Sequence, residues 1–378
     1  MKRMWHRRQT TGIAIALFSG FAAFARAQSI TEFPVPTAGS GVTYIAPGPD
    51  GNLWFTESSV GKIGRITTAG AVTEFPLPSA TSRPQAIAAG PDGAMWITEG
   101  AVNKIARMTT AGVATEFTVS ATPQFITGGP DQAVWFTEVG NHLGRISTSA
   151  PNTIVEYSTV LPTTNMGGVT TGPDGNIWFT ELDHDKSARV ARIDLTKLSG
   201  CNTNPSLCIT EWVVPDEDGR VLLRSIKSGP DGALWFTPGA FPQTGKVDHI
   251  TTSGVITHFA LPTAAAFDIT QGPDGALWYT AGTVVGRITT SGTVTSEITV
   301  SSPLGISGGP DGNIWFTEGV NKIGRVNLSG GGGNPTPTPT PTLSVTPTRT
   351  PTGTSAGSTR AHVTPIHPPT PRSGIAGR

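Results

Sequence analysis

The sequence has 378 residues, with 26 basic and 26 acidic side chains and only two cysteines. Residues 1–27 hold five of the basic residues and residues 330–378 hold four, and neither segment has an acidic one; residues 28–329 therefore keep 17 basic against 26 acidic residues, a formal charge of −9. This acidic excess argues against nucleic acid or an anionic membrane surface as the partner. No segment approaches the roughly twenty apolar residues that a membrane span needs.

The N-terminal segment has the pattern of an export signal. A basic stretch from Lys2 to Arg8 precedes a mostly apolar run from Thr11 to Ala25, and Ala25-Arg26-Ala27 fits a small-x-small cleavage site. This order is typical of a secretory signal peptide. We therefore expect residues 1–27 to be removed and the protein to be periplasmic or extracellular, with a retained N-terminal anchor as the alternative.

The next element, from Ile30 to Pro36, resembles a segment that follows every later repeat unit except the last. The last unit runs to Leu328 and is followed by a run of glycines, so it lacks a fourth strand of its own. We expect Ile30 to Pro34 to supply that strand by pairing with Lys322 to Asn327, which would leave no open sheet edge.

A ten-residue unit dominates the chain from here on. The first copy, Gly48-Pro-Asp-Gly-Asn-Leu-Trp-Phe-Thr-Glu57, recurs as near-copies at 90–99, 129–138, 172–181, 229–238, 272–281 and 309–318. Pro-Asp-Gly suits a tight turn, and the residues after it form a strand in which Trp54 and Phe55 leave opposite faces. Both faces must be buried, and a period near 40 residues predicts an all-β, seven-bladed β-propeller of four-stranded blades.

Each repeat contains four predicted strands, which in the second copy lie near 85–89, 94–98, 104–109 and 114–119. A two-residue turn at Ala69-Gly70 would place Arg65 opposite Glu74 on the two outer strands. The same register would pair Arg107 with Glu116, and His249 with His258 in the fifth repeat.

The fourth repeat is enlarged, and Cys201 and Cys208 lie in its outer hairpin. Two cysteines in an exported chain predict a disulfide, with two free thiols as the alternative. Beyond the propeller, which we place at 28–329, residues 330–378 are rich in Gly and then in Thr and Pro. That composition predicts a disordered tail or a glycosylated stalk.

Two repeated sets of carboxylates are candidates for chemistry. The turn aspartates resemble a metal ring, but the turn itself explains them: Asp50, Asp92, Asp131, Asp174, Asp231, Asp274 and Asp311. The glutamates that end the second strand of most repeats either support the neighbouring turns or line a pocket: Glu57, Glu99, Glu138, Glu181 and Glu318. The unrepeated cluster Glu181, Asp183, His184 and Asp185 is either solvated loop charge or a site for a hard cation or for acid/base chemistry.

The unit Gly-Pro-Asp-Gly-Asn-Ile-Trp-Phe-Thr-Glu, with Asn-Lys-Ile-Gly-Arg and Thr-Glu-Phe-x-Leu-Pro after it, resembles the virginiamycin B lyase (streptogramin lyase) family over residues 30–328. The resemblance implies a seven-bladed propeller and a Mg²⁺-assisted carbon–oxygen lyase that opens cyclic depsipeptides. It also implies catalytic histidines at two positions, which hold Phe267 and Leu304 here. The same position in the other repeats holds Thr43, Gln85, Gln124, Gly167 and Arg224.

Because Phe and Leu cannot remove a proton, the sequence favours a ligand-binding propeller that holds a small molecule, peptide or glycan at its axis, and we expect a monomer. The candidate pocket residues are Thr43, Gln85, Gln124, Arg224, Asp268, Glu181, Asp183, His184 and Asp185. A lyase that uses Mg²⁺ and a rearranged site is the alternative, and calcium-dependent lactonase chemistry is a third. The sequence leaves open whether the protein is an enzyme.

Overall fold

The computed structural model describes residues 28–328, apart from 161–164, 183–186, 216–220, 241–244 and 263. All of them belong to a compact unit, Met1–Pro335, and a second unit, Thr336–Arg378, lies outside the described part. The predicted signal peptide, the tail, and the loop residues Asp183, His184 and Asp185 also lie outside it. Within the described ranges no helix is long and apolar enough to cross a membrane.

The described residues form seven four-stranded sheets. Blade 1 contains β2 (Val42–Pro47), β3 (Leu53–Glu57), β4 (Lys62–Ile66) and β5 (Val72–Pro76). Blade 2 contains β6 (Pro84–Ala89), β7 (Met95–Glu99), β8 (Lys104–Met108) and β9 (Ala114–Thr118), and blade 3 contains β10 (Pro123–Gly128), β11 (Ala133–Glu138), β12 (His142–Ser147) and β13 (Ile154–Ser158).

The remaining blades follow the same plan. Blade 4 contains β14 (Asn165–Thr171), β15 (Ile177–Leu182), β16 (Ala188–Ile193) and β17 (Ile209–Val213), and blade 5 contains β18 (Val221–Ser228), β19 (Leu234–Ala240), β20 (Lys246–Ile250) and β21 (Ile256–Ala260). Blade 6 contains β22 (Ala266–Gln271), β23 (Leu277–Ala281), β24 (Val284–Ile288) and β25 (Val294–Thr299), and blade 7 contains β26 (Pro303–Gly308), β27 (Ile314–Glu318), β28 (Lys322–Asn327) and β1 (Ser29–Pro34).

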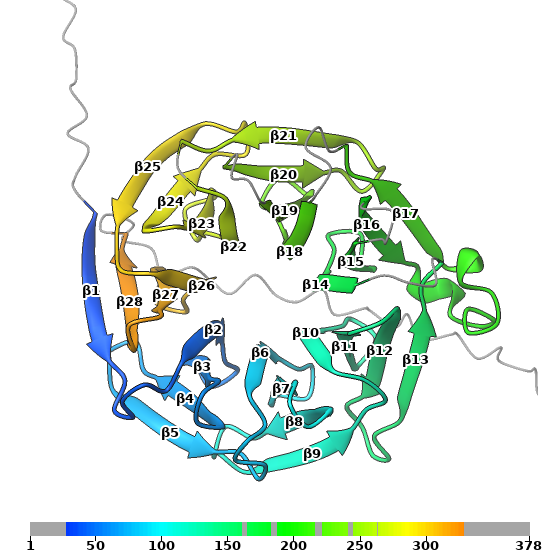
Figure 1. Cartoon of the computed structure of the whole chain (residues 1–378), viewed down its shortest axis with the longest axis horizontal. Helices are drawn as coiled ribbons and strands as arrows, with labels where there is room; N and C mark the ends of the chain where they lie inside the picture. The colour runs from blue at the N-terminus through cyan, green and yellow to red at the C-terminus, as the bar shows by residue number, and fades with distance from the viewer. Residues whose placement is uncertain are drawn as a thin grey trace, which may run out of the picture. The chain divides into compact units, whose positions relative to one another are not determined.

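The sheets stand around a common axis, with the first strand of each blade innermost and the fourth outermost (Figure 1). The predicted seven-bladed β-propeller is therefore confirmed. Blade 7 is completed by β1, which pairs with β28 from Ser29 opposite Asn327 to Pro34 opposite Lys322. The two ends of the described chain thus share one sheet, as the missing strand of the last repeat predicted.

The hydrophobic core lies between the blades rather than inside any one of them. Trp54 and Phe55 are both fully buried. Trp54 packs against residues of blade 2 such as Ile97, and Phe55 packs on the other side in the cluster that contains Trp315 of blade 7. Each blade therefore contributes to two interfaces, which explains why adjacent large side chains recur in every unit.

The expected Arg–Glu register is wrong by one residue. Glu74 lies opposite Gly64, and Arg65 lies opposite Thr73, because the hairpin loop has three residues and ends on Gly70 with φ of 94°. A glycine in the left-handed region is typical of three-residue hairpin loops. The same shift separates Arg107 from Glu116.

The histidines of blade 5 are displaced in the same way. His258 lies opposite Asp248 rather than His249, and its Nδ1 is 2.8 Å from the Asp248 carboxylate. His249 instead approaches Asp231 of the blade's inner turn.

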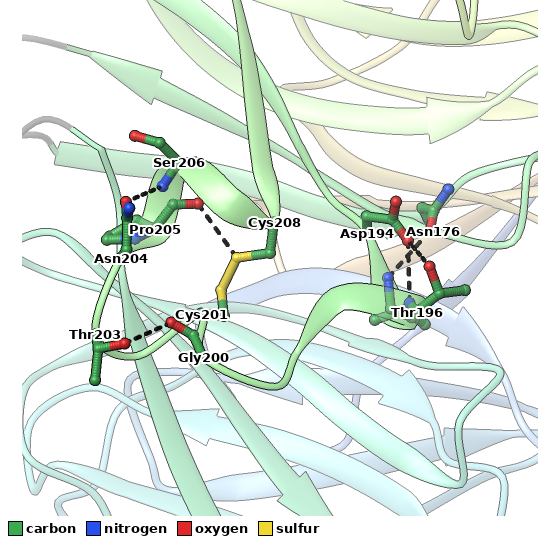
Figure 2. Close-up of a disulfide and its surroundings, with 11 residues drawn as sticks. Asn176, Asp194, Thr196, Gly200, Cys201, Thr203, Asn204, Pro205, Ser206 and Cys208 are labelled. Carbon is green, nitrogen blue, oxygen red and sulfur yellow. Dashed lines mark hydrogen bonds between the residues drawn. A yellow bond between two sulfur atoms is a disulfide. The ribbon is translucent and has the colours of Figure 1, made fainter.

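The predicted disulfide joins Cys201 to Cys208. It lies in the hairpin between β16 and β17, next to the short 3-10 helices η1 (Leu195–Lys197) and η2 (Pro205–Leu207) (Figure 2). Asp194 and Asn204 cap these helices by accepting backbone hydrogen bonds from Thr196 and Ser206. Both cysteines are buried in the cluster between blades 3 and 4, so the insertion extends that interface instead of lying loosely outside it.

Candidate functional site

One position in the innermost strand holds different side chains in different blades, although the strand pairing shifts register there in every blade. We call it the axial slot, and it consists of Thr43, Gln85, Gln124, Gly167, Arg224, Phe267 and Leu304. Each slot residue lies where the pairing of the first two strands shifts register. A β-bulge leaves a residue out of the ladder and redirects its side chain, so this position is suited to presenting a variable group.

The repeat holds the slot backbone in place through a threonine of the preceding blade. Thr56 Oγ1 donates to the Gln85 carbonyl over 3.0 Å, and Thr317 Oγ1 donates to the Thr43 carbonyl over 2.6 Å. The threonines of blades 2, 3, 5 and 6 make the corresponding bond to Gln124, Gly167, Phe267 and Leu304. Six slot residues are therefore held by the repeat while their side chains vary. Arg224 is the exception, because Thr180 Oγ1 of blade 4 has no hydrogen-bond partner.

Three aromatic rings from separate blades meet among the inner strands. Tyr44 of β2 lies with its ring centroid 5.7 Å from that of Phe125 of β10 and 6.0 Å from that of Phe267 of β22. Burial raises the pKa of the Tyr44 phenol; the Asp268 carboxylate raises it further and the Arg224 guanidinium opposes that effect. Tyr44 is therefore a neutral hydrogen-bond donor at physiological pH and not a base.

Arg224 is the charged member of the axial slot, and its side chain is exposed. Its guanidinium carbon lies 5.1 Å from the centroid of the Phe267 ring. A guanidinium stacked on an aromatic ring keeps its donors available for a carboxylate or phosphate. Arg224 and Phe267 thus present a cation and an apolar face side by side.

The buried carboxylate of Asp268 connects neighbouring blades through hydrogen bonds. It is 3% exposed, and its Oδ1 accepts hydrogen bonds from Ser225 Oγ at 2.6 Å and from its neighbour's backbone, Ile269 N, at 2.9 Å. Its Oδ2 accepts one from Ile306 N at 3.0 Å. Because both oxygens already join blades 5, 6 and 7, this carboxylate is not placed to bind Mg²⁺.

The other predicted pocket residues are only partly brought together. Thr43, Gln85 and Gln124 are half-buried slot residues. Glu181 is buried at the end of β15, the second strand from the axis, where it lies opposite Arg189. Sequence reasoning missed Tyr44 and Phe125; the available signal was a large ring at a position that holds Ala86, Gly168 or Gly305 in other blades.

The strand-ending glutamates form a second, more peripheral set. Glu57, Glu99, Glu138, Glu181 and Glu318 are at most 1% exposed. Burial is the main cause that raises the pKa of Glu57, Glu99 and Glu138 to about 7, and it also raises that of Glu318. A pKa near neutral pH is found both for catalytic carboxyls and for buried structural ones. The pKa values alone therefore do not make these glutamates a functional site.

The turn aspartates make hydrogen bonds and ion pairs within their own blades, which accounts for their recurrence. Each accepts a hydrogen bond from the indole N–H of the tryptophan four residues later, as Asp50 does from Trp54 over 2.9 Å. Six of them also pair with an arginine of the third strand, and Asp231 pairs with His249. Although burial opposes ionisation, the bonds from Trp54 and Asn52 keep the pKa of Asp50 below its ordinary value.

Fold and site together define a seven-bladed β-propeller whose variable residues gather at the inner strands. The model of the virginiamycin B lyase family matches residues 15–198 and 204–341. The match covers most of the chain, so the chain belongs to that family.

Solved structures agree with this assignment. A streptogramin B lyase structure is 30% identical, with a TM-score of 0.70 over 79% of this chain and 97% of that one. Virginiamycin B lyase from Staphylococcus aureus is 31% identical, with a TM-score of 0.70 over 80% of this chain and 100% of that one; a catalytically inactive variant with quinupristin has the same values. The comparison with curated protein sequences gives no match.

Proposed function

We propose that this chain is an exported ligand-binding propeller that holds a small molecule or peptide with an anionic group and an apolar body at the axial slot. The observation that carries the proposal is the exposed Arg224 guanidinium stacked on Phe267. Export is supported by the buried disulfide, since such bonds persist in oxidising compartments, and by the signal-like N-terminus.

The chemistry of the slot supports binding more than turnover. The two positions at which the family resemblance implies histidines hold Phe267 and Leu304, neither of which transfers protons. Tyr44 keeps its proton at neutral pH. The arrangement offers instead a charge-assisted contact from Arg224 and ring surface from Phe267, Tyr44 and Phe125.

Binding is tested by thermal stability against a panel of carboxylate-bearing metabolites, peptides and acidic glycans. A ligand that binds only the folded state raises the melting temperature, and Arg224→Ala should remove most of that rise. Lys197→Ala is the matched control, because it removes one positive charge from an exposed side chain of blade 4. A ligand that stabilises the wild type and Arg224→Ala equally would refute the proposed site.

The alternative is a carbon–oxygen lyase with a rearranged site. One of the solved relatives is an inactive lyase variant with quinupristin, so quinupristin with Mg²⁺ is the probe, and the ring-opened product is detected by mass. We expect no rapid opening, because loss of a positioned base removes about two to four orders of magnitude of rate. Rapid opening abolished by His184→Ala would establish the lyase alternative, with a base on the loop after β15.

A further inference from the structure

A carboxylate–cation–carboxylate arrangement recurs on the outer three strands of the blades. In blade 1 the buried Glu57 ends β3, Lys62 begins β4 opposite it, and Lys62 Nζ lies 2.9 Å from Glu74 Oε2 on β5. Blades 2 and 7 repeat it with Lys104 and Lys322. Blade 4 uses Arg189 between Glu181 and Glu211.

Two blades lack the inner glutamate, although blade 5 still begins its third strand with Lys246. Where the inner glutamate is replaced, by Pro238 in blade 5 and Ala281 in blade 6, no such triad forms. Among the five blades that keep the glutamate, four place a lysine or arginine beside it. Blade 3 alone places a histidine, His142, between Glu138 of β11 and Glu156 of β13.

The serine contacts of the outer glutamate are the same in blades 2 and 3, and blade 3 adds a backbone donor to the inner glutamate. In blade 2, Ser79 donates its backbone N–H to Glu116 over 2.8 Å. In blade 3, Ser120 donates its N–H and hydroxyl to Glu156 over 3.2 and 2.7 Å, and Ala121 N–H donates to Glu138 Oε1 over 3.2 Å. The two carboxylates are thus held in place without the permanent positive charge that the other blades supply.

The remaining oxygen of Glu138 has no hydrogen-bond partner, and oxygens of Glu57, Glu99 and Glu318 in the lysine-containing blades have none either. The Glu138 side chain is fully buried, and its Oε2 makes no hydrogen bond. A buried, unsatisfied carboxylate oxygen is costly unless a cation or a donor completes it. One donor atom each from Glu138, His142 and Glu156 lies within 4.8 Å of the other two, and within the described ranges no other group of three such residues comes this close.

We propose that Glu138, His142 and Glu156 form a binding site for a divalent transition metal, of which Zn²⁺ is the best matched. One imidazole and two carboxylates are a ligand set that Zn²⁺ accepts, with water completing the coordination. An ion at about 2.1 Å from each donor atom needs donor separations of about 3.5 Å. Small side-chain movements therefore close the site, and the metal takes the place that lysine occupies in blades 1, 2 and 7.

The test is Zn²⁺ titration of the purified protein by calorimetry at pH 7.5, in excess Mg²⁺ to suppress weak carboxylate sites. The wild type should bind one more equivalent of Zn²⁺ than His142→Lys, with affinity at least about 100-fold tighter than any residual binding. His142→Lys reproduces the arrangement already present in blade 2 and should fold normally. The visible spectrum of bound Co²⁺ gives a second readout, which Glu138→Gln should weaken.

Two further variants make the result decisive. Lys104→His places the blade 3 ligand set in blade 2 and should add a Zn²⁺ equivalent. His258→Asn removes another half-exposed histidine that pairs with Asp248 and should leave the stoichiometry unchanged. Equal Zn²⁺ binding by the wild type and His142→Lys would overturn the proposal and would mean that a proton, not a metal, balances these carboxylates. These outcomes do not depend on the ligand at the axial slot.

Discussion

The turns between the first two strands of each blade differ from the axial slot in what they repeat. In these turns the same contacts recur around the ring, such as the Asp–Trp hydrogen bond of every blade. At the slot the backbone contact recurs for six of the seven residues, while the side chain is Thr, Gln, Gly, Arg, Phe or Leu. Repeated residues therefore maintain the architecture, and a position that varies at constant backbone geometry is where specificity is to be sought.

The largest expected effect comes from opening the ring. Deleting residues 28–38 removes β1, which forms the outer strand of blade 7 and stacks Phe33 on Trp315 at a centroid distance of 5.5 Å. The deletion leaves an unpaired edge on β28, so we expect loss of soluble protein or a sharp fall in melting temperature. Deleting residues 336–378 is the control and should change neither. An unchanged melting point after removal of β1 would contradict the closure.

A smaller effect is expected from a single repeated contact. Asp92→Ala leaves the buried indole N–H of Trp96 without its acceptor and Arg107 without its partner. An unsatisfied buried donor costs about 1–3 kcal/mol, measured as a fall in the free energy of unfolding in urea. Asp92→Asn keeps an acceptor oxygen and should lose less. Equal losses would show that charge, rather than the indole bond, is what the turn requires.

The buried glutamates predict a pH dependence of stability. Burial raises the pKa of Glu99 from 4.5 to about 7, so between these values the folded protein keeps a proton that the unfolded chain has released. This contribution to stability is complete below about pH 4.5 and is lost as pH rises through 7. Glu57 and Glu138 act in the same sense.

Glu99→Gln isolates this effect. The amide stays neutral, so the variant should lose less stability between pH 5 and pH 8 than the wild type does, by about 1–2 kcal/mol. The measurement is the free energy of unfolding at several pH values. Carboxyls with lowered pKa values, such as Glu74 and Asp194, change stability only below this window. Parallel curves for the two proteins would show that Glu99 is ionised throughout.

The smallest effect on stability is expected at the slot itself. Arg224 is exposed and stacks on one ring, so Arg224→Ala should change the free energy of unfolding by no more than about 0.5 kcal/mol. Chemical unfolding of the ligand-free protein measures this. A loss above about 2 kcal/mol would make Arg224 part of the architecture and would remove the contrast between slot and turns.

The amino-acid sequence by itself determined the architecture of this protein. Seven blades are specified by the Gly-Pro-Asp-Gly turns and by adjacent aromatic residues such as Trp54 and Phe55, because these local patterns repeat at a fixed period. Closure is specified by the extra strand segment at Ile30, which precedes the first repeat unit. The cysteine pair, together with the signal-like N-terminus, likewise predicted the disulfide. Such features need no knowledge of which distant residues meet.

The tertiary structure alone decided the sites. A third residue in the hairpin loop that ends at Gly70 moved Glu74 from Arg65 to Lys62, and the sequence contains no sign of this shift. The β-bulges that place the slot, and the meeting of Tyr44, Phe125 and Phe267, join residues far apart in the chain. Glu138, His142 and Glu156 become a cluster only when β11, β12 and β13 pair in register. Hairpin geometry sets the strand register and closure of the ring brings the blades together, so these contacts depend on residues that are distant in the sequence.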